Sequence, residues 1–141
     1  MILLDVNILV YACAKRTPQH MYCRQFVDEM VNGKSPFGMA PEVLGSMVRV
    51  VTNPKIFGAL ISQEDALTFC EWLLGAPNCV IVRPGARHWG IFARLCRESG
   101  ATGNLIPDAW LAALAIEHGC EWVSNDTDFG LFPGLRWRKP F

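Results

Sequence analysis

The amino-acid sequence predicts an α/β fold with a central, mostly parallel sheet flanked by helices. The first observation behind this prediction is the alternation of short apolar segments with longer segments of helical pattern along the whole chain, which is typical of parallel α/β proteins. The second is size and composition, because 141 residues with 51% apolar side chains suit one domain with a substantial core. The sequence shows no internal repeat or linker, so residues 1–141 are expected to form a single domain.

The chain opens with a short buried strand over residues 2–5, and a helix is expected from Asn7 to about Arg16. Thr17 and Pro18 form a favourable N-cap and N1 pair. They predict a second helix that Gly33 ends.

An apolar segment at residues 37–40 predicts the second strand. The helix that follows, residues 41–53, should stop before Pro54, because the residue before a proline disfavours helical geometry. Residues 62–65 resemble a capping box, which predicts another helix running to Gly75.

Two further buried strands are expected at residues 79–82 and 120–124, and two helices lie between them. The first helix covers "PGARHWGIFARLCRESG" and ends at Gly100. The second is rich in alanine, with Pro107 suited to the N1 position and Gly119 to the C′ position. The tail "GLRWRKPF" should add one more extended piece.

Acidic side chains follow the predicted strands or open the helices after them. Asp5 ends the first strand, and Glu42 opens the helix after the second. Asp108 lies in the first turn of the alanine-rich helix, while Asp126 and Asp128 follow the fourth strand. Ligand sites in open parallel sheets form beyond the carboxyl ends of the strands. Four separate segments could therefore bring carboxylates to one cleft.

Clustered carboxylates repel one another, and a divalent cation, most suitably Mg²⁺ or Mn²⁺, is the simplest way to offset that repulsion. Such an ion can bind a phosphate substrate and lower the pKa of an attacking water. Each acid also has a purely structural interpretation. Glu42 and Asp108 suit the helix dipole, Asp5 and Asn7 could cap the first helix, and the last two acids could be loop residues. Their coincidence at one predicted edge favours the metal site.

Other features narrow the class of protein. A net charge of zero and a pI of about 6.8 argue against a broadly basic nucleic-acid-binding face. The six cysteines include no C-x-x-C pair, so reduced core cysteines are expected rather than a zinc site. Glu117 lies on the helix face opposite Asp108 and is excluded from the site. The apolar N-terminus lacks a basic leader and is interrupted by Asp5 and Asn7, so we expect a cytoplasmic protein without membrane contact.

Four stretches, taken in order, resemble a PIN domain. They are the Asp5-Val-Asn7 segment, Glu42 in "APEVLGSMVRVVTNPKIF", Asp108 in "NLIPDAWLAALAIEHG", and "VSNDTDF". The set is similar to VapC-type toxins of bacterial toxin–antitoxin pairs and covers nearly the whole chain. The resemblance implies a three-layer sandwich and an endoribonuclease, dependent on Mg²⁺ or Mn²⁺, that inhibits translation by cleaving tRNA or rRNA. It also implies a VapB-type antitoxin as partner, and a homodimer.

The resemblance assigns roles by motif. The implied catalytic acids are Asp5, Glu42, Asp108 and Asp126. Among these, the implied metal ligands are Asp5, Asp108 and Asp126. The implied accessory residues are Asn7, Ser124 and Asp128. VapC-type toxins often have threonine where Ser124 stands, and the hydroxyl is retained.

One stretch without acids, from Trp72 to Arg97, offers candidate contacts to RNA phosphates. The candidates are Arg83, Arg87, Arg94 and Arg97. A solvated face or an antitoxin contact is an equal alternative. For the whole chain, three other interpretations stay open: a receiver-like, metal-binding signalling module, a non-catalytic binding domain with the same fold, and a DNA-directed nuclease of similar fold.

Overall fold

The computed structural model describes residues 1–57 and 61–141, and its centre is a five-stranded sheet in the order β3-β2-β1-β4-β5. Every neighbouring pair of strands is parallel, which confirms the predicted fold class. The strands are β1 (Ile2–Leu4), β2 (Phe37–Met39), β3 (Cys79–Ile81), β4 (Glu121–Val123) and β5 (Trp137–Arg138).

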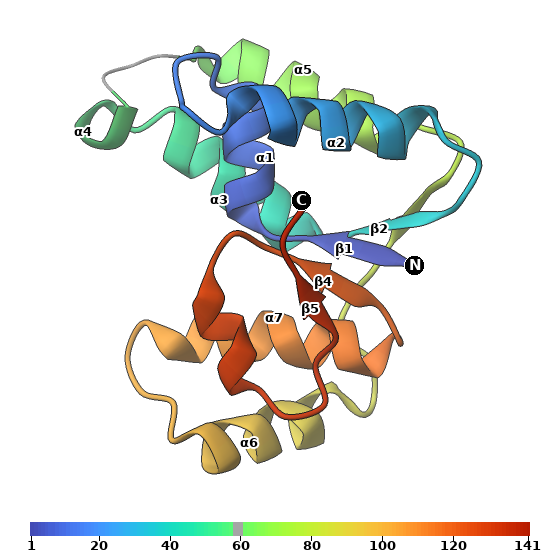
Figure 1. The fold of residues 1–141 in the computed structure, drawn as a ribbon, viewed down its shortest axis with the longest axis vertical. Helices are drawn as coiled ribbons and strands as arrows, with labels where there is room; N and C mark the ends of the chain where they lie inside the picture. Colours follow the sequence, from blue (N-terminus) through green and yellow to red (C-terminus); the bar gives the residue numbers. More distant parts are fainter. Residues whose placement is uncertain (58–60) are drawn as a thin grey trace.

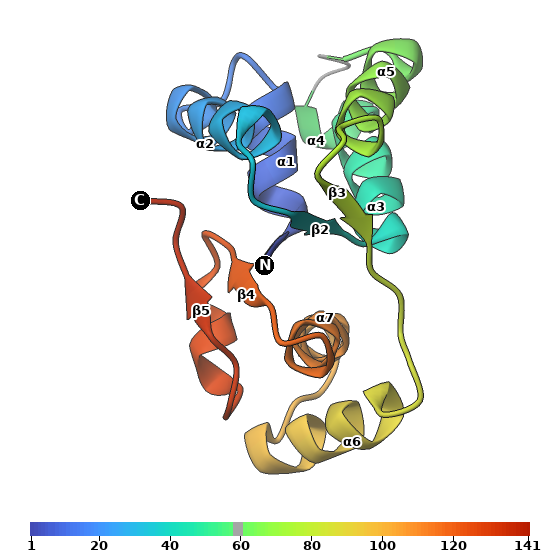
Figure 2. The ribbon, with the colours of Figure 1, turned by 90° about the vertical axis from the view of Figure 1, so that its right-hand side faces the viewer.

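Helices cover both faces of this sheet and make three layers. Figures 1 and 2 show the first five helices above the sheet and the last two below it. The upper helices are α1 (Val6–Cys13), α2 (His20–Asn32), α3 (Pro41–Val51), α4 (Pro54–Phe57) and α5 (Gln63–Leu74). The lower helices are α6 (His88–Ser99) and α7 (Leu105–Glu117). A 3₁₀ helix, η1 (Thr127–Leu131), follows β4.

The core lies between the sheet and these layers. Leu3 and Leu4 of β1 and Trp122 of β4 are buried at its centre. The buried face of α7 carries four alanines, Ala109, Ala112, Ala113 and Ala115. Side chains this small let the helix axis approach the sheet closely, so the start of α7 is held near the ends of β1 and β4.

Three helix starts differ from the prediction. α2 begins at His20 because Thr17 forms a turn instead of capping, with its hydroxyl donating to the Ala14 carbonyl at 2.8 Å. α6 begins at His88 rather than at Pro84. α7 begins two residues before Pro107, which occupies its third position. A proline is tolerated there because the first four N–H groups of a helix have no intrahelical partner.

The prediction that residues 79–82 form a buried strand is wrong in its burial. β3 is an edge strand, and Val80 and Ile81 are 42% and 43% exposed. Only Val82, just after the strand, is buried. The apolar run at residues 79–82 therefore predicted the strand correctly, but it could not indicate that the strand lies at the edge of the sheet. The short helix α4 was not predicted, whereas the extended tail is confirmed as β5.

All six cysteines are free thiols, as expected. Within residues 1–57 and 61–141, every helix falls short of the length and hydropathy needed to cross a membrane.

Candidate metal centre

Three aspartates meet where β4 ends and α7 begins. Asp108, Asp126 and Asp128 each offer a carboxylate oxygen, and these three oxygens lie within 4.8 Å of one another. Asp108 comes from the first turn of α7, while Asp126 caps η1 by accepting a hydrogen bond from the Asp128 amide at 2.9 Å. We call this group the acidic trio. It brings together two of the acids predicted as metal ligands and the one predicted as accessory.

Asp5 lies beside the trio and is 7% exposed. Its Oδ1 accepts the Val6 amide at 2.7 Å and so caps α1. Its Oδ2 accepts the Ser124 hydroxyl at 2.6 Å and the Asn7 side-chain amide at 3.2 Å. Both oxygens are thus fixed by donors of the protein, and Asp5 is held rigidly at the carboxyl end of β1.

Ser124 joins the carboxyl ends of β1 and β4. It is fully buried, and besides donating to Asp5 its hydroxyl oxygen accepts the Asp126 amide at 2.9 Å and the Asn7 amide group at 3.1 Å. Asn7 in turn accepts the Asn125 amide at 3.3 Å through its Oδ1. Two residues predicted as accessory thus position Asp5 and the backbone of Asp126, which explains why a hydroxyl is needed at position 124.

The carboxylates destabilise one another's charged forms. The pKa of Asp108 is raised to about 6, first by burial and then by the negative charges of Asp5, Asp126 and Asp128. Burial also raises the pKa of Asp5, although hydrogen bonds from Ser124 and Val6 oppose the shift. Within the described part of the chain, none of these four acids forms a salt bridge. The site therefore carries negative charge that no side-chain cation balances.

This donor set fits a divalent ion such as Mg²⁺ or Mn²⁺, because hard oxygen ligands at this spacing can share one cation. Asp108 must lose its proton to bind an ion. We therefore expect Mn²⁺ affinity to fall by about ten-fold per pH unit below pH 6. Calorimetric titration at pH 7.5, 6.0 and 5.0 measures this, and an affinity that stays constant over that range would contradict the assignment of Asp108.

Glu42 stands apart from the trio. It is exposed in the first turn of α3 and lines a separate groove of about 360 Å³ with Val6 and Pro107. This places it at the rim of the same sheet edge without joining the carboxylates that gather there. Its predicted catalytic role stays a prediction.

The four candidate arginines are all exposed, but they divide into two groups. Arg83 and Arg87 lie next to the C-terminal end of α7, because the Arg83 carbonyl accepts His118 and the Arg87 guanidinium donates to the Glu117 carbonyl. Asp108 is at the other end of that helix. Arg94 pairs with Glu98 at 3.1 Å. Arg97 lies in the last turn of α6, and the role of the four arginines in RNA binding stays a prediction.

Glu117 has a role that the sequence did not reveal. Its carboxylate, from a side chain only 6% exposed, accepts the amides of Gly85 at 2.7 Å and Arg87 at 2.9 Å. Burial alone would raise its pKa, but these hydrogen bonds and the nearby histidines His118 and His88 lower it. Glu117 thus satisfies two backbone amides of the segment that precedes α6, which begins at His88.

Replacing Glu117 with glutamine should lower the free energy of unfolding by about 2 kcal/mol, because hydrogen bonds to a charged group are lost in a buried place. The stabilisation should be present above the ordinary glutamate pKa and fade at lower pH, since the folded-state pKa is lowered. Urea unfolding measures both effects. Glu98→Gln is the matched control, because its exposed helical ion pair should contribute less than about 0.5 kcal/mol. Equal losses in the two variants would contradict the argument.

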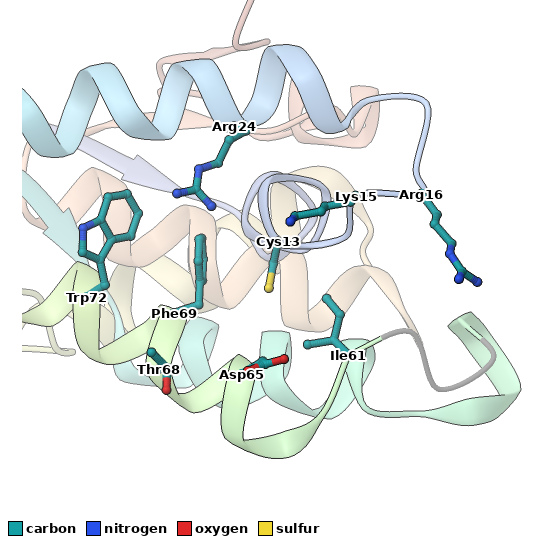
Figure 3. Close-up of a pocket in the computed structure, with 9 residues that line it drawn as sticks. All are labelled: Cys13, Lys15, Arg16, Arg24, Ile61, Asp65, Thr68, Phe69 and Trp72. Carbon is teal, nitrogen blue, oxygen red and sulfur yellow. The ribbon is translucent and has the colours of Figure 1, made fainter.

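A pocket of about 660 Å³, larger than the groove beside Glu42, lies elsewhere, between the α1–α2 segment and α5. Figure 3 shows Lys15, Arg16 and Arg24 around it with a single acid, Asp65. The Arg24 guanidinium lies 5.8 Å and 5.1 Å from the ring centroids of Phe69 and Trp72. Three cations around one carboxylate would repel a metal ion, so size does not identify the metal site in this molecule.

Comparison with known families agrees with this geometry. The family model described as PIN domain matches residues 2–135. The chain belongs to the PIN domain family. A VapC ribonuclease of Mycobacterium bovis is 41% identical over 140 residues, which cover 99% of this PIN domain chain and 95% of the relative. Ribonuclease VapC25 of Mycobacterium tuberculosis is 38% identical and covers 99% of both chains.

Solved structures show the same fold. VapBC2 from Rickettsia felis, bound to a DNA fragment from its promoter, matches with a TM-score of 0.70 at 21% identity, covering 99% of this chain and 98% of that one. VapC20 of Mycobacterium tuberculosis, a toxin that cleaves the sarcin–ricin loop, matches with a TM-score of 0.68 at 14% identity, covering 96% and 99%. Both confirm the PIN fold of this chain.

Proposed function

We propose that this PIN domain is an endoribonuclease that depends on Mg²⁺ or Mn²⁺ and serves as the toxin of a toxin–antitoxin pair. The observation that carries the proposal is the acidic trio beside Asp5, four acids that form no salt bridge with any residue that the structure describes. The near-full-length similarity to proteins named VapC ribonucleases supports RNA as the substrate. Structured tRNA or rRNA is the proposed target.

In this proposal the acidic trio holds the metal, and the Asp5 carboxylate adds a further negative charge beside it. Bound there, a divalent ion would offset charge on the phosphodiester and lower the pKa of the attacking water. The protein itself contributes by holding the groups around the metal in fixed positions. Ser124 and Asn7 fix the Asp5 carboxylate and the Asp126 backbone through hydrogen bonds of 2.6–3.2 Å. Glu42 is proposed to orient water or substrate from the rim.

A VapB-type antitoxin is the proposed protein partner, and a homodimer the proposed assembly. Several structures with the same fold are complexes of a VapC with its VapB partner, including one from Salmonella typhimurium that is bound to DNA, with a TM-score of 0.66. Light scattering of the purified chain, alone and co-expressed with the product of a neighbouring short reading frame, measures both assemblies.

Cleavage of total RNA tests the proposed function. The purified protein should produce discrete fragments in Mn²⁺ or Mg²⁺, none in EDTA, and fragments again when excess Mn²⁺ is added back. Intact RNA under all conditions, together with tight Mn²⁺ binding, would favour a non-catalytic metal-binding module. Equal cleavage with and without EDTA would contradict a metal-dependent mechanism.

A further inference from the structure

A depression of about 260 Å³ opens directly beside Asp5. Its lining residues come from the start of α1 and the end of α3, two helices that lie side by side in Figures 1 and 2. They are Asp5, Val6, Asn7, Val10, Tyr11 and Val50. We call this depression the α1–α3 pocket. Asp5 forms part of its wall, so the pocket adjoins one of the four acids of the site.

The polar groups of the α1–α3 pocket are already paired within the protein. Both Asp5 oxygens accept hydrogen bonds. The Asn7 amide group donates to Asp5 and Ser124, and its oxygen accepts the Asn125 amide. These groups leave no cation or free amide for a phosphate. The rest of the wall is three valines and the Tyr11 side chain, which suits a flat, uncharged group.

We infer that the α1–α3 pocket binds one unpaired nucleobase of the RNA, next to the phosphate held at the metal centre. The inference rests on the proposed ribonuclease function. Tyr11 lies six residues beyond Asp5, about 9 Å along the helix. A phosphate at the carboxylates would therefore leave its own base near Tyr11. Unpaired RNA bases are commonly bound by stacking on aromatic side chains and by apolar contact.

Other hollows in the molecule fit a base less well. The groove beside Glu42 contains none of the four acids that gather at the site, and the Trp110 ring within it already packs edge-on against His88 and Phe92, with centroids 4.2 Å and 5.1 Å away. The pocket in Figure 3 has its aromatic rings covered by Arg24. The α1–α3 pocket combines a wall of valines and Tyr11 with Asp5, one of the four acids of the site.

Cleavage of two matched oligonucleotides tests the inference. One is a single-stranded RNA, and the other has the same length and backbone but carries abasic riboses. In Mn²⁺, the wild-type protein should cleave the RNA with a kcat/KM about ten-fold higher, since stacking of a base on an aromatic side chain has that order of effect. Val50→Phe, which fills the pocket, and Tyr11→Ala, which removes the ring, should each bring the ratio close to one. Tyr11→Phe keeps the ring and should restore most of it.

Val80→Phe is the matched control, because it adds the same bulk on the exposed edge strand β3. It should keep the wild-type ratio. Far-ultraviolet circular dichroism establishes that each variant is folded, and Tyr11→Ala gives an independent result if Val50→Phe misfolds. A wild-type ratio near one, or a ratio unchanged in both pocket variants, would overturn the base pocket while leaving the proposed function standing. No Mn²⁺-dependent cleavage by the wild type, either of these oligonucleotides or of total RNA, would overturn both.

Discussion

Replacing Asp108 with asparagine should abolish metal-dependent RNA cleavage while it stabilises the metal-free protein. Asp108 supplies one of the three oxygens of the acidic trio, and its charge is opposed by burial and by three neighbouring acids. Removing a charged group that stabilises the transition state lowers the cleavage rate by on the order of 10³-fold. Removing the same charge from the empty protein relieves repulsion. We expect a gain of about 1 kcal/mol at pH 7.5, after allowance for solvent screening of this half-exposed group.

The two effects can be separated by metal and by pH. Mn²⁺ should raise the melting temperature of the wild type and have little effect on Asp108→Asn. Because the folded-state pKa of Asp108 is raised, the free energy of unfolding of the metal-free wild type should increase as the pH falls from 7 to 5. In Asp108→Asn this increase should be much smaller, because the variant has no carboxyl group at position 108 to protonate. Asp28→Asn, on the half-exposed outer surface of α2, is the control for loss of one acid. Full cleavage by Asp108→Asn would remove the proposed mechanism.

Replacing Ser124 with alanine should impair both stability and cleavage. The variant removes a donor to Asp5 and leaves the Asp126 amide without its acceptor, in a place with no exposure to solvent. We expect a loss of about 1–3 kcal/mol in the free energy of unfolding. Cleavage should fall by about 10–100-fold, because residues that orient metal ligands contribute effects of that size.

Ser124→Thr separates the hydroxyl from the rest of the side chain, since threonine keeps the donor. It should retain most of the cleavage rate, and Ser99→Ala, which removes a hydroxyl that accepts the Ala101 amide at the end of α6, should leave cleavage at the wild-type level. Chemical denaturation and initial cleavage rates in Mn²⁺ measure the outcome. If Ser124→Ala cleaved RNA as fast as Ser124→Thr, the hydroxyl would have no role in positioning Asp5.

The fold and the location of the site were predictable because they depend on local patterns. Short apolar runs separated by helical segments are enough to predict a parallel sheet. The carboxyl ends of its strands then predict where Asp5 and Asp126 meet. Ser124 and Asn7 were found through the motif, and the structure now gives the physical reason in their hydrogen bonds to Asp5.

What the sequence missed depends on contacts between distant segments. The exposure of Val80 follows from the order of strands in the sheet, which no local pattern contains. The structural role of Glu117 follows from its hydrogen bond to Gly85, thirty-two residues away in the chain. The sequence placed Asp126 and Asp128 after the fourth strand, and the structure adds the turn in which Asp126 accepts the Asp128 amide beside Asp108.

The most direct test of the metal centre is anomalous diffraction from a crystal of the wild-type protein grown with Mn²⁺. We expect an anomalous peak within about 2.0–2.4 Å of carboxylate oxygens from Asp108 and Asp126, with Asp128 or Asp5 close by and no peak in crystals of Asp108→Asn. A protein that cleaves RNA in Mn²⁺ but shows its only manganese peak away from these aspartates would contradict it.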